Sequence, residues 1–148
     1  MRFNHLYNKL LHENEYQGQH QPGESDYAAP ANDLTKLYPD DVYGPKALVY
    51  YGSGTADTRS MDRKALKILH SLRDKPDAEV TIYRAIPDDI KDDQINSGDW
   101  VTITKDYAIS HGEGRLKGEY KILQKTVKAK DIYTDADSFQ EFGYRPKK

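Results

Sequence analysis

Arg84 is the residue whose position in this sequence most needs a chemical explanation. Residues 80–86 (VTIYRAI) have the alternating pattern of a β-strand, so Arg84 shares the apolar face of Val80, Ile82 and Ile86. A guanidinium on an apolar face is unfavourable unless a partner compensates its charge. Two interpretations follow. Arg84 belongs to a buried ion pair or a solvated strand end, or it lines a cleft and holds a phosphate or ribose with its fork of donors.

Two further segments supply polar side chains to the same kind of site. Thr102 and Thr104 are two residues apart in the next predicted strand, so their hydroxyls lie on one face. Glu141 is flanked by Phe139 and Phe142 in the last predicted strand. A carboxylate among aromatic rings is partly desolvated, which strengthens its attraction to a cation or to a reaction centre that gains positive charge. An arginine, two threonines and a glutamate on three strands therefore predict a binding or catalytic site.

The elements that would carry these residues make an α+β domain. Helical periodicity predicts a helix at 57–74 and a helical turn that carries Tyr107 and His111 on one face, and Pro87 with two aspartates predicts a short helix to residue 95. Alternation predicts strands at 80–86, 99–104, 119–130, 131–134 and 139–144. The chain has no repeat and no strand–helix–strand rhythm, which disfavours a Rossmann-type fold.

The N-terminal third differs in composition from the rest. Apolar residues at three- and four-residue steps predict an amphipathic helix that ends at residues 13–15, and residues 16–39 are rich in Gln, Gly, Pro, Asn, Asp and Ser. The expected organisation is therefore an N-terminal helix and irregular arm at residues 1–43 and a domain at residues 44–148. Two arrangements of the arm stay open: a helix on a tether, or a segment wrapped over the domain.

The composition excludes several classes of site. The 148 residues contain no Cys, which removes disulfides, thiolate zinc sites, iron–sulfur clusters and a cysteine nucleophile. Lys and Arg total 22 against 24 Asp and Glu, so a broadly basic nucleic-acid-coating protein is disfavoured. No apolar run approaches the roughly 18 residues of a membrane helix. The histidines of the arm, His5, His12 and His20, lack ligand spacing, so we expect no metal site.

The order of these motifs resembles a known family. Tyr83-Arg84, then WVTIT at 100–104, then Glu141 resembles the Arg–Ser/Thr–Glu pattern of mono-ADP-ribosyltransferases. The run from residue 83 to residue 144 is similar to ADP-ribosyltransferase-like proteins of bacteriophages and prophages, and the resemblance covers about residues 43–146. It implies a split β-sandwich that binds NAD, as co-substrate, in a cleft between two small sheets. It also implies action in the cytoplasm of a bacterial host, or association with the virion.

The resemblance also implies a role for each residue. Arg84 would hold the NAD phosphates or the nicotinamide-side ribose, together with Tyr83. Thr102 would brace the catalytic Glu141, and Thr104 matches the last hydroxyl of the family's strand. Glu141 would hydrogen-bond the ribose and stabilise the positive charge that builds as nicotinamide departs. Tyr107 and His111 would form a wall that stacks on nicotinamide or adenine, unless they simply pack.

One position departs from the family pattern. Many transferases that modify arginine carry Glu or Gln two residues before the catalytic glutamate, where this chain has Phe139. Gln140, the immediate neighbour, would point the other way in a strand. The acceptor therefore stays open, with a host protein first and a nucleic acid second, and so does the oligomeric state. The alternatives are a non-catalytic interaction or inhibitor module that keeps the transferase fold, and an NAD glycohydrolase.

Overall fold

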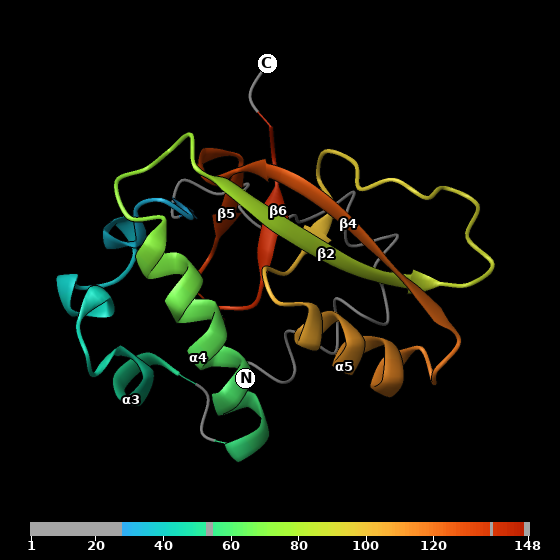
Figure 1. Ribbon diagram of the computed structural model, residues 1–148, viewed down its shortest axis with the longest axis horizontal. Coiled ribbons are helices and arrows are strands. Elements are labelled where there is room, and N and C mark those ends of the chain that lie inside the picture. Colours follow the sequence, from blue (N-terminus) through green and yellow to red (C-terminus); the bar gives the residue numbers. More distant parts are fainter. Residues whose placement is uncertain (1–27, 53–54, 137, 147–148) are drawn as a thin grey trace.

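The computed structural model describes residues 28–52, 55–136 and 138–146, which form a mixed α+β fold with two antiparallel sheets (Figure 1). The helices are α3 (Ala47–Tyr51), α4 (Ala56–Ser71) and α5 (Lys105–Arg115), and the 3-10 turns are η1 (Leu34–Lys36), η2 (Asp40–Tyr43) and η3 (Ala129–Asp131). The strands are β1 (Ala29–Pro30), β2 (Glu79–Pro87), β3 (Trp100–Val101), β4 (Tyr120–Lys128), β5 (Ile132–Thr134) and β6 (Phe142–Tyr144). The α+β class predicted from the sequence is confirmed.

The two sheets meet at β2. One sheet has the order β1-β5-β6-β3, and the other is a ribbon of β2 and β4 that pairs from Glu79 with Lys128 to Pro87 with Tyr120. Figure 1 shows this ribbon passing in front of β5 and β6. The backbones of Tyr83 and Thr102 form a bridge between the sheets, with N···O distances of 2.8 and 2.9 Å. The segment after β3 is therefore held directly against the middle of β2.

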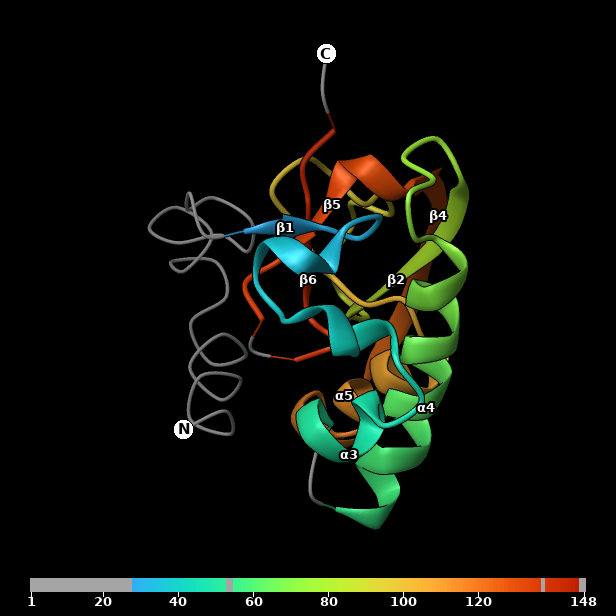
Figure 2. The same ribbon diagram turned by 90° about the vertical axis from the view of Figure 1, so that its left-hand side faces the viewer.

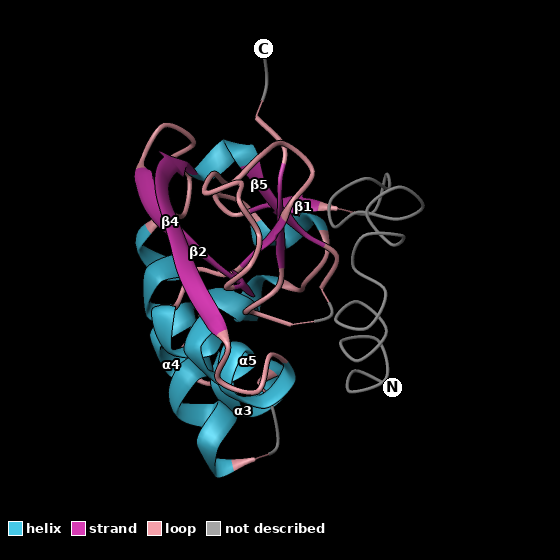
Figure 3. Cartoon of the chain, turned by 90° about the vertical axis from the view of Figure 1, so that its right-hand side faces the viewer, coloured by secondary structure: helices cyan, strands magenta, loops and turns pink. Residues whose placement is uncertain are grey.

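The helices gather at one end of the molecule. Figure 2 shows α3, α4 and α5 on one side and β1, β5 and β6 on the other, and Figure 3 shows the β2–β4 ribbon running between the two ends. The α4 helix starts at the N-cap Thr55, whose hydroxyl accepts from the Thr58 N–H at 3.3 Å. Its apolar stripe is buried in the core, as its periodicity predicts, through Ala65, Leu66, Leu69 and Leu72.

The described part of the predicted arm, residues 28–43, packs into the same core. The β1 strand pairs with β5, and Leu34 and Val42 are fully buried. The Leu34 N–H also donates to the Tyr43 hydroxyl at 2.9 Å. These residues are part of the domain, and the amphipathic helix predicted nearer the N-terminus lies outside the described residues. No helix in the described ranges is both long and apolar enough to cross a membrane.

Three predicted elements differ from the structure. The strand predicted at residues 99–104 is observed only at Trp100–Val101, because Thr104 already serves as the N-cap of α5. Residues 88–95 contain no helix, because Asp92 and Asn96 form side-chain hydrogen bonds that compete with helical ones. Asp92 accepts from the Gln94 N–H at 3.1 Å and from the Asn96 amide at 2.8 Å. The last predicted strand begins at Phe142 rather than at residue 139, because the chain turns at residues 138–141, where the Gln140 N–H donates to the Ser138 hydroxyl at 3.0 Å.

Candidate functional site

Arg84 lies on the buried face of β2, as the alternation predicts, with 7% of its surface exposed. Its Nη1 donates to the Trp100 carbonyl at 2.8 Å, and its Nε is 3.8 Å from Oδ2 of Asp99. The buried ion pair considered from the sequence is therefore present. It joins β2 to the start of β3, and the charge of Arg84 also acts on His111 of α5.

An aromatic cluster surrounds Trp100. The rings of Tyr107 and His111, four residues apart on α5, have centroids 6.0 and 5.4 Å from the indole centroid. The prediction that these two residues share a helix face is confirmed. Among the described residues, neither Trp100 Nε1 nor His111 Nδ1 has a hydrogen-bond partner, although both atoms are buried. Two buried polar atoms without partners beside an arginine fit a site that takes a polar ligand.

His111 is neutral near pH 7. Burial, and then the positive charges of Arg84 and Arg115, lower its pKa from 6.5 to about 4. A neutral imidazole has one donor and one acceptor nitrogen, so His111 offers a hydrogen bond without adding charge next to Arg84. The site therefore combines one cation with two uncharged hydrogen-bonding rings.

The hydroxyls of Thr102 and Thr104 converge on Gln140. Thr104 Oγ1 donates to the Gln140 Oε1 at 2.7 Å, and Thr102 Oγ1 donates to the same oxygen at 3.3 Å. The expectation that Thr102 braces Glu141 directly is corrected by this geometry: the acceptor of both hydroxyls is the preceding residue. The reason is the turn at residues 138–141, which replaces strand alternation and directs the Gln140 amide toward the threonines.

The other end of the Gln140 amide binds a buried carboxylate. Gln140 Nε2 donates to Asp62 Oδ1 at 3.1 Å, and the two residues are 1% and 3% exposed. Asp62 belongs to α4, so this hydrogen bond links the long helix to the segment before β6. Sequence reasoning missed Asp62, and it placed Gln140 in a regular strand instead of this network. The available signal was that Asp62 precedes Leu66 and Leu69 by four and seven residues, on the buried face of the helix.

Glu141 lies at the end of the β3–β6 ladder and is 2% exposed. Trp100 pairs with Gly143 and Val101 with Phe142, so the same register sets Thr102 opposite Glu141, one step beyond the ladder. The Glu141 N–H donates to the Ser138 carbonyl at 3.4 Å. The predicted carboxylate is therefore buried next to the backbone that carries the threonines.

Tyr83 and Phe139 have structural contacts. Tyr83 holds Thr102 through its backbone, and strand alternation puts its half-buried side chain on the face of β2 opposite Arg84. Phe139 is buried in the core, where its ring stacks on Tyr38 with a centroid distance of 5.6 Å. An apolar core residue thus stands two positions before Glu141.

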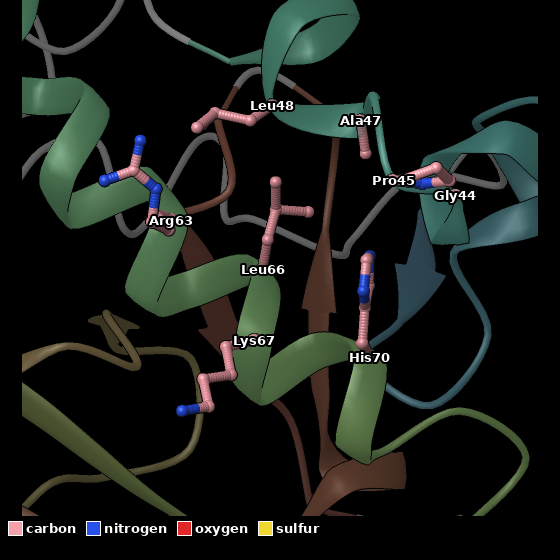
Figure 4. A pocket seen from close by; sticks show the side chains of 8 residues that line it. All are labelled: Gly44, Pro45, Ala47, Leu48, Arg63, Leu66, Lys67 and His70. Atoms are coloured by element: carbon pink, nitrogen blue, oxygen red, sulfur yellow. The ribbon is translucent and has the colours of Figure 1, made fainter.

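Two cavities lie away from these side chains. A groove of about 320 Å³ between α3 and α4 is lined by residues of the segment 44–48 and of α4 (Figure 4). A second cavity of about 540 Å³ is lined by Pro87, Asp88, Asp89, Leu116 and Glu119. Neither cavity contains Arg84 or Glu141. Among the described ranges, no group of three His, Asp or Glu side chains is placed to hold a metal ion.

Comparison with known proteins gives no match: no protein-family model, no curated protein and no solved structure matches this chain.

Proposed function

We propose that the chain is an NAD-dependent mono-ADP-ribosyltransferase with the split β-sandwich of that family. It would be encoded by a bacteriophage and would transfer ADP-ribose to a host macromolecule, with a protein as the first candidate. The observation that carries the proposal is the adjacency of the three motifs. Arg84 is on β2, Thr102 is bridged to β2 at Tyr83, and Glu141 directly precedes β6, the partner of β3.

The proposed reaction breaks the glycosidic bond between nicotinamide and ribose. The bonding electron pair leaves with nicotinamide, a nucleophile of the acceptor forms the new bond to the ribose carbon, and the acceptor loses its proton. Positive charge builds at the ribose carbon, so a buried carboxylate at Glu141 would stabilise the transition state more than the ground state. The guanidinium of Arg84 and the rings of Trp100 and His111 supply the groups that would bind the NAD diphosphate and ribose.

Gln140 is a positioning residue in this proposal. Its side chain is held by Thr102, Thr104 and Asp62, and its backbone carries Glu141. Three hydrogen bonds to one amide limit the rotation of the 138–141 turn. Because a misplacement of about 1 Å can cost on the order of 100-fold in rate, we assign this network to holding the carboxylate in register.

Access to the site requires movement. Arg84 is 7% exposed and Glu141 is 2% exposed, so NAD reaches both only after the segments that bury them separate. We therefore expect NAD binding to be slower than a diffusion-limited encounter, since a conformational step comes first.

The test is incubation of the full chain with NAD labelled in the adenylate part and a bacterial lysate. Wild type is compared with Glu141→Gln, and Glu79→Gln, at an exposed position on β2, is the matched control. The expected result is label on a macromolecule plus free nicotinamide for wild type and Glu79→Gln, and neither for Glu141→Gln. Full labelling by Glu141→Gln would overturn the site assignment. Nuclease and protease treatment of the labelled product distinguishes a nucleic acid from a protein acceptor.

A second candidate, an NAD glycohydrolase, is favoured by one observation. Phe139 occupies the position that activates the acceptor in arginine-modifying transferases, and its ring is buried against Tyr38. With no acceptor-activating side chain there, water would take the ribose. Nicotinamide release without label on any macromolecule identifies this activity. No NAD consumption, even with lysate present, identifies the non-catalytic interaction module.

A further inference from the structure

The groove between α3 and α4 has an apolar floor that opens to solvent. Figure 4 shows Leu48 and Leu66 pointing into it from the two helices, with Pro45 and His70 at one end. The two residues that follow Leu48 in α3 are also exposed: Val49 is 78% exposed and Tyr50 is 58% exposed. The volume of about 320 Å³ is near the bottom of the range of roughly 300–1,000 Å³ for enclosed ligand sites. The groove is therefore suited to an inserted side chain.

A stripe of positive charge borders this groove. Arg59, Arg63 and Lys67 recur at four-residue steps on α4, so they lie on one side of the helix, and all three are exposed. Within the part of the chain that the structure describes, none of the three forms an ion pair. Like charges at this spacing repel one another, so the stripe makes α4 less stable by itself.

Lys64 of the same helix behaves differently. It points toward α5 and forms an ion pair with Asp106. The positive charges of α4 are thus compensated on the α5 side and uncompensated on the side of the groove. Figure 4 shows Arg63 and Lys67 extending away from the end of the groove that is formed by Pro45.

We propose that this surface, defined by the groove, Val49 and the stripe, binds an acidic segment of a partner protein. An apolar side chain of that segment enters the groove, and its carboxylates pair with the stripe. The combination of an apolar centre and a charged rim is the usual composition of a protein interface. A phosphate backbone would use the stripe but not the apolar floor, so a protein segment fits more of the observations. This inference does not depend on the NAD reaction.

The probe is a labelled synthetic amphipathic peptide with glutamates on one helical face and leucines on the other, mixed with the full chain and followed by fluorescence anisotropy. One control peptide replaces the glutamates with lysines, and a second replaces the leucines with serines. We expect the acidic peptide to bind and both control peptides to bind more weakly. The lysine peptide lacks the carboxylates that would pair with the stripe, and the serine peptide lacks the apolar side chains that would enter the groove.

Variants of exposed residues locate the binding. The double variant Arg63→Glu/Lys67→Glu should weaken the affinity for the acidic peptide by about tenfold or more. Two ion pairs with the peptide carboxylates are lost, and charge repulsion replaces them. Val49→Ser should weaken it by a smaller factor. Lys64→Gln, which removes a positive charge from the other side of α4, should leave the affinity unchanged. Circular dichroism of each variant checks that α4 remains folded.

Three results would overturn the proposal. In the first, the acidic peptide binds no better than the lysine or serine control peptide. In the second, the Arg63/Lys67 double variant binds the acidic peptide as tightly as wild type does. In the third, a labelled single-stranded oligonucleotide binds more tightly than the acidic peptide and uses the same two cations. The last result would assign the surface to nucleic acid. Recovery of binding when the lysine peptide meets the double variant would support direct charge pairing.

Discussion

The amide nitrogen of Gln140 donates a hydrogen bond to the carboxylate of Asp62 across 78 residues of sequence, at 3.1 Å. Both side chains are buried, and the amide oxygen of Gln140 accepts from Thr102 and Thr104. A single amide therefore ties α4, the segment after β3 and the turn before β6 together. That turn ends at Glu141, so the network connects the fold to the proposed chemistry.

Replacing Gln140 with Leu should destabilise the protein strongly. The change keeps much of the volume but removes the hydrogen bonds that the Gln140 amide makes with one buried carboxylate and two buried hydroxyls, and a lost buried partner costs about 1–3 kcal/mol. We expect a loss of about 3 kcal/mol or more in the free energy of unfolding, measured by urea denaturation. Gln124→Leu, at an exposed position on β4, is the control and should change it little. Equal effects of the two substitutions would contradict the network.

Thr104 should matter more than Thr102 for this network. Its hydroxyl is 2.7 Å from the Gln140 oxygen, against 3.3 Å for Thr102. We expect Thr104→Val to cost about 1–2 kcal/mol of unfolding free energy and Thr102→Val less. Thr104→Ser keeps the hydroxyl and should recover most of the loss. If Thr102→Val is the more damaging change, the order of the two hydrogen bonds is wrong.

Acid should unfold the protein partly through His111. Its pKa is lowered from 6.5 to about 4 in the folded state, so the unfolded chain binds the proton more readily. The resulting stability is present above pH 6.5 and is lost as the pH falls toward 4. The contribution is up to about 3 kcal/mol. In His111→Phe, the free energy of unfolding should fall less steeply between pH 7 and pH 4.5 than in wild type, and parallel curves would contradict the prediction.

The charge of Arg84 should affect the pKa of His111. Arg84→Met removes one of the two cations that lower the histidine pKa, so the pKa should rise, while burial still holds it below 6.5. Arg84→Lys keeps the charge and should leave the pKa near its wild-type value. Titration of the imidazole signals by NMR measures both variants. A pKa that moves equally in the two variants would indicate a change in burial instead of a charge effect.

The same pair of variants tests the ion pair with Asp99. Arg84→Met leaves a largely buried carboxylate without its cation, which we expect to cost about 3 kcal/mol of unfolding free energy. Arg84→Lys should cost less, because the charge stays while the hydrogen bond from Nη1 to the Trp100 carbonyl is lost. A Met variant as stable as wild type would show that Asp99 finds sufficient compensation elsewhere.

Local patterns in the sequence were sufficient for several features. The alternation of residues 80–86 placed Arg84 on the buried face of β2, and the spacing of Tyr107 and His111 placed both on one face of α5. Each of these predictions depends on neighbours within one turn or one strand. Where local side-chain hydrogen bonds competed with a regular element, as at Asp92 and Asn96, the same reasoning predicted a helix that does not form.

The sequence by itself determined that Arg84 lies on the apolar face of its strand, because that placement follows from periodicity within a single element; it did not reveal the buried Asp62 or Gln140. Only the tertiary structure decided which buried polar side chains meet. The threonine hydroxyls reach Gln140 instead of Glu141 because the chain turns at residues 138–141, and Asp62 joins them because α4 packs against that turn. Such contacts join residues 36 to 78 positions apart, and their geometry exists only when the helix, the two sheets and the turn have assembled.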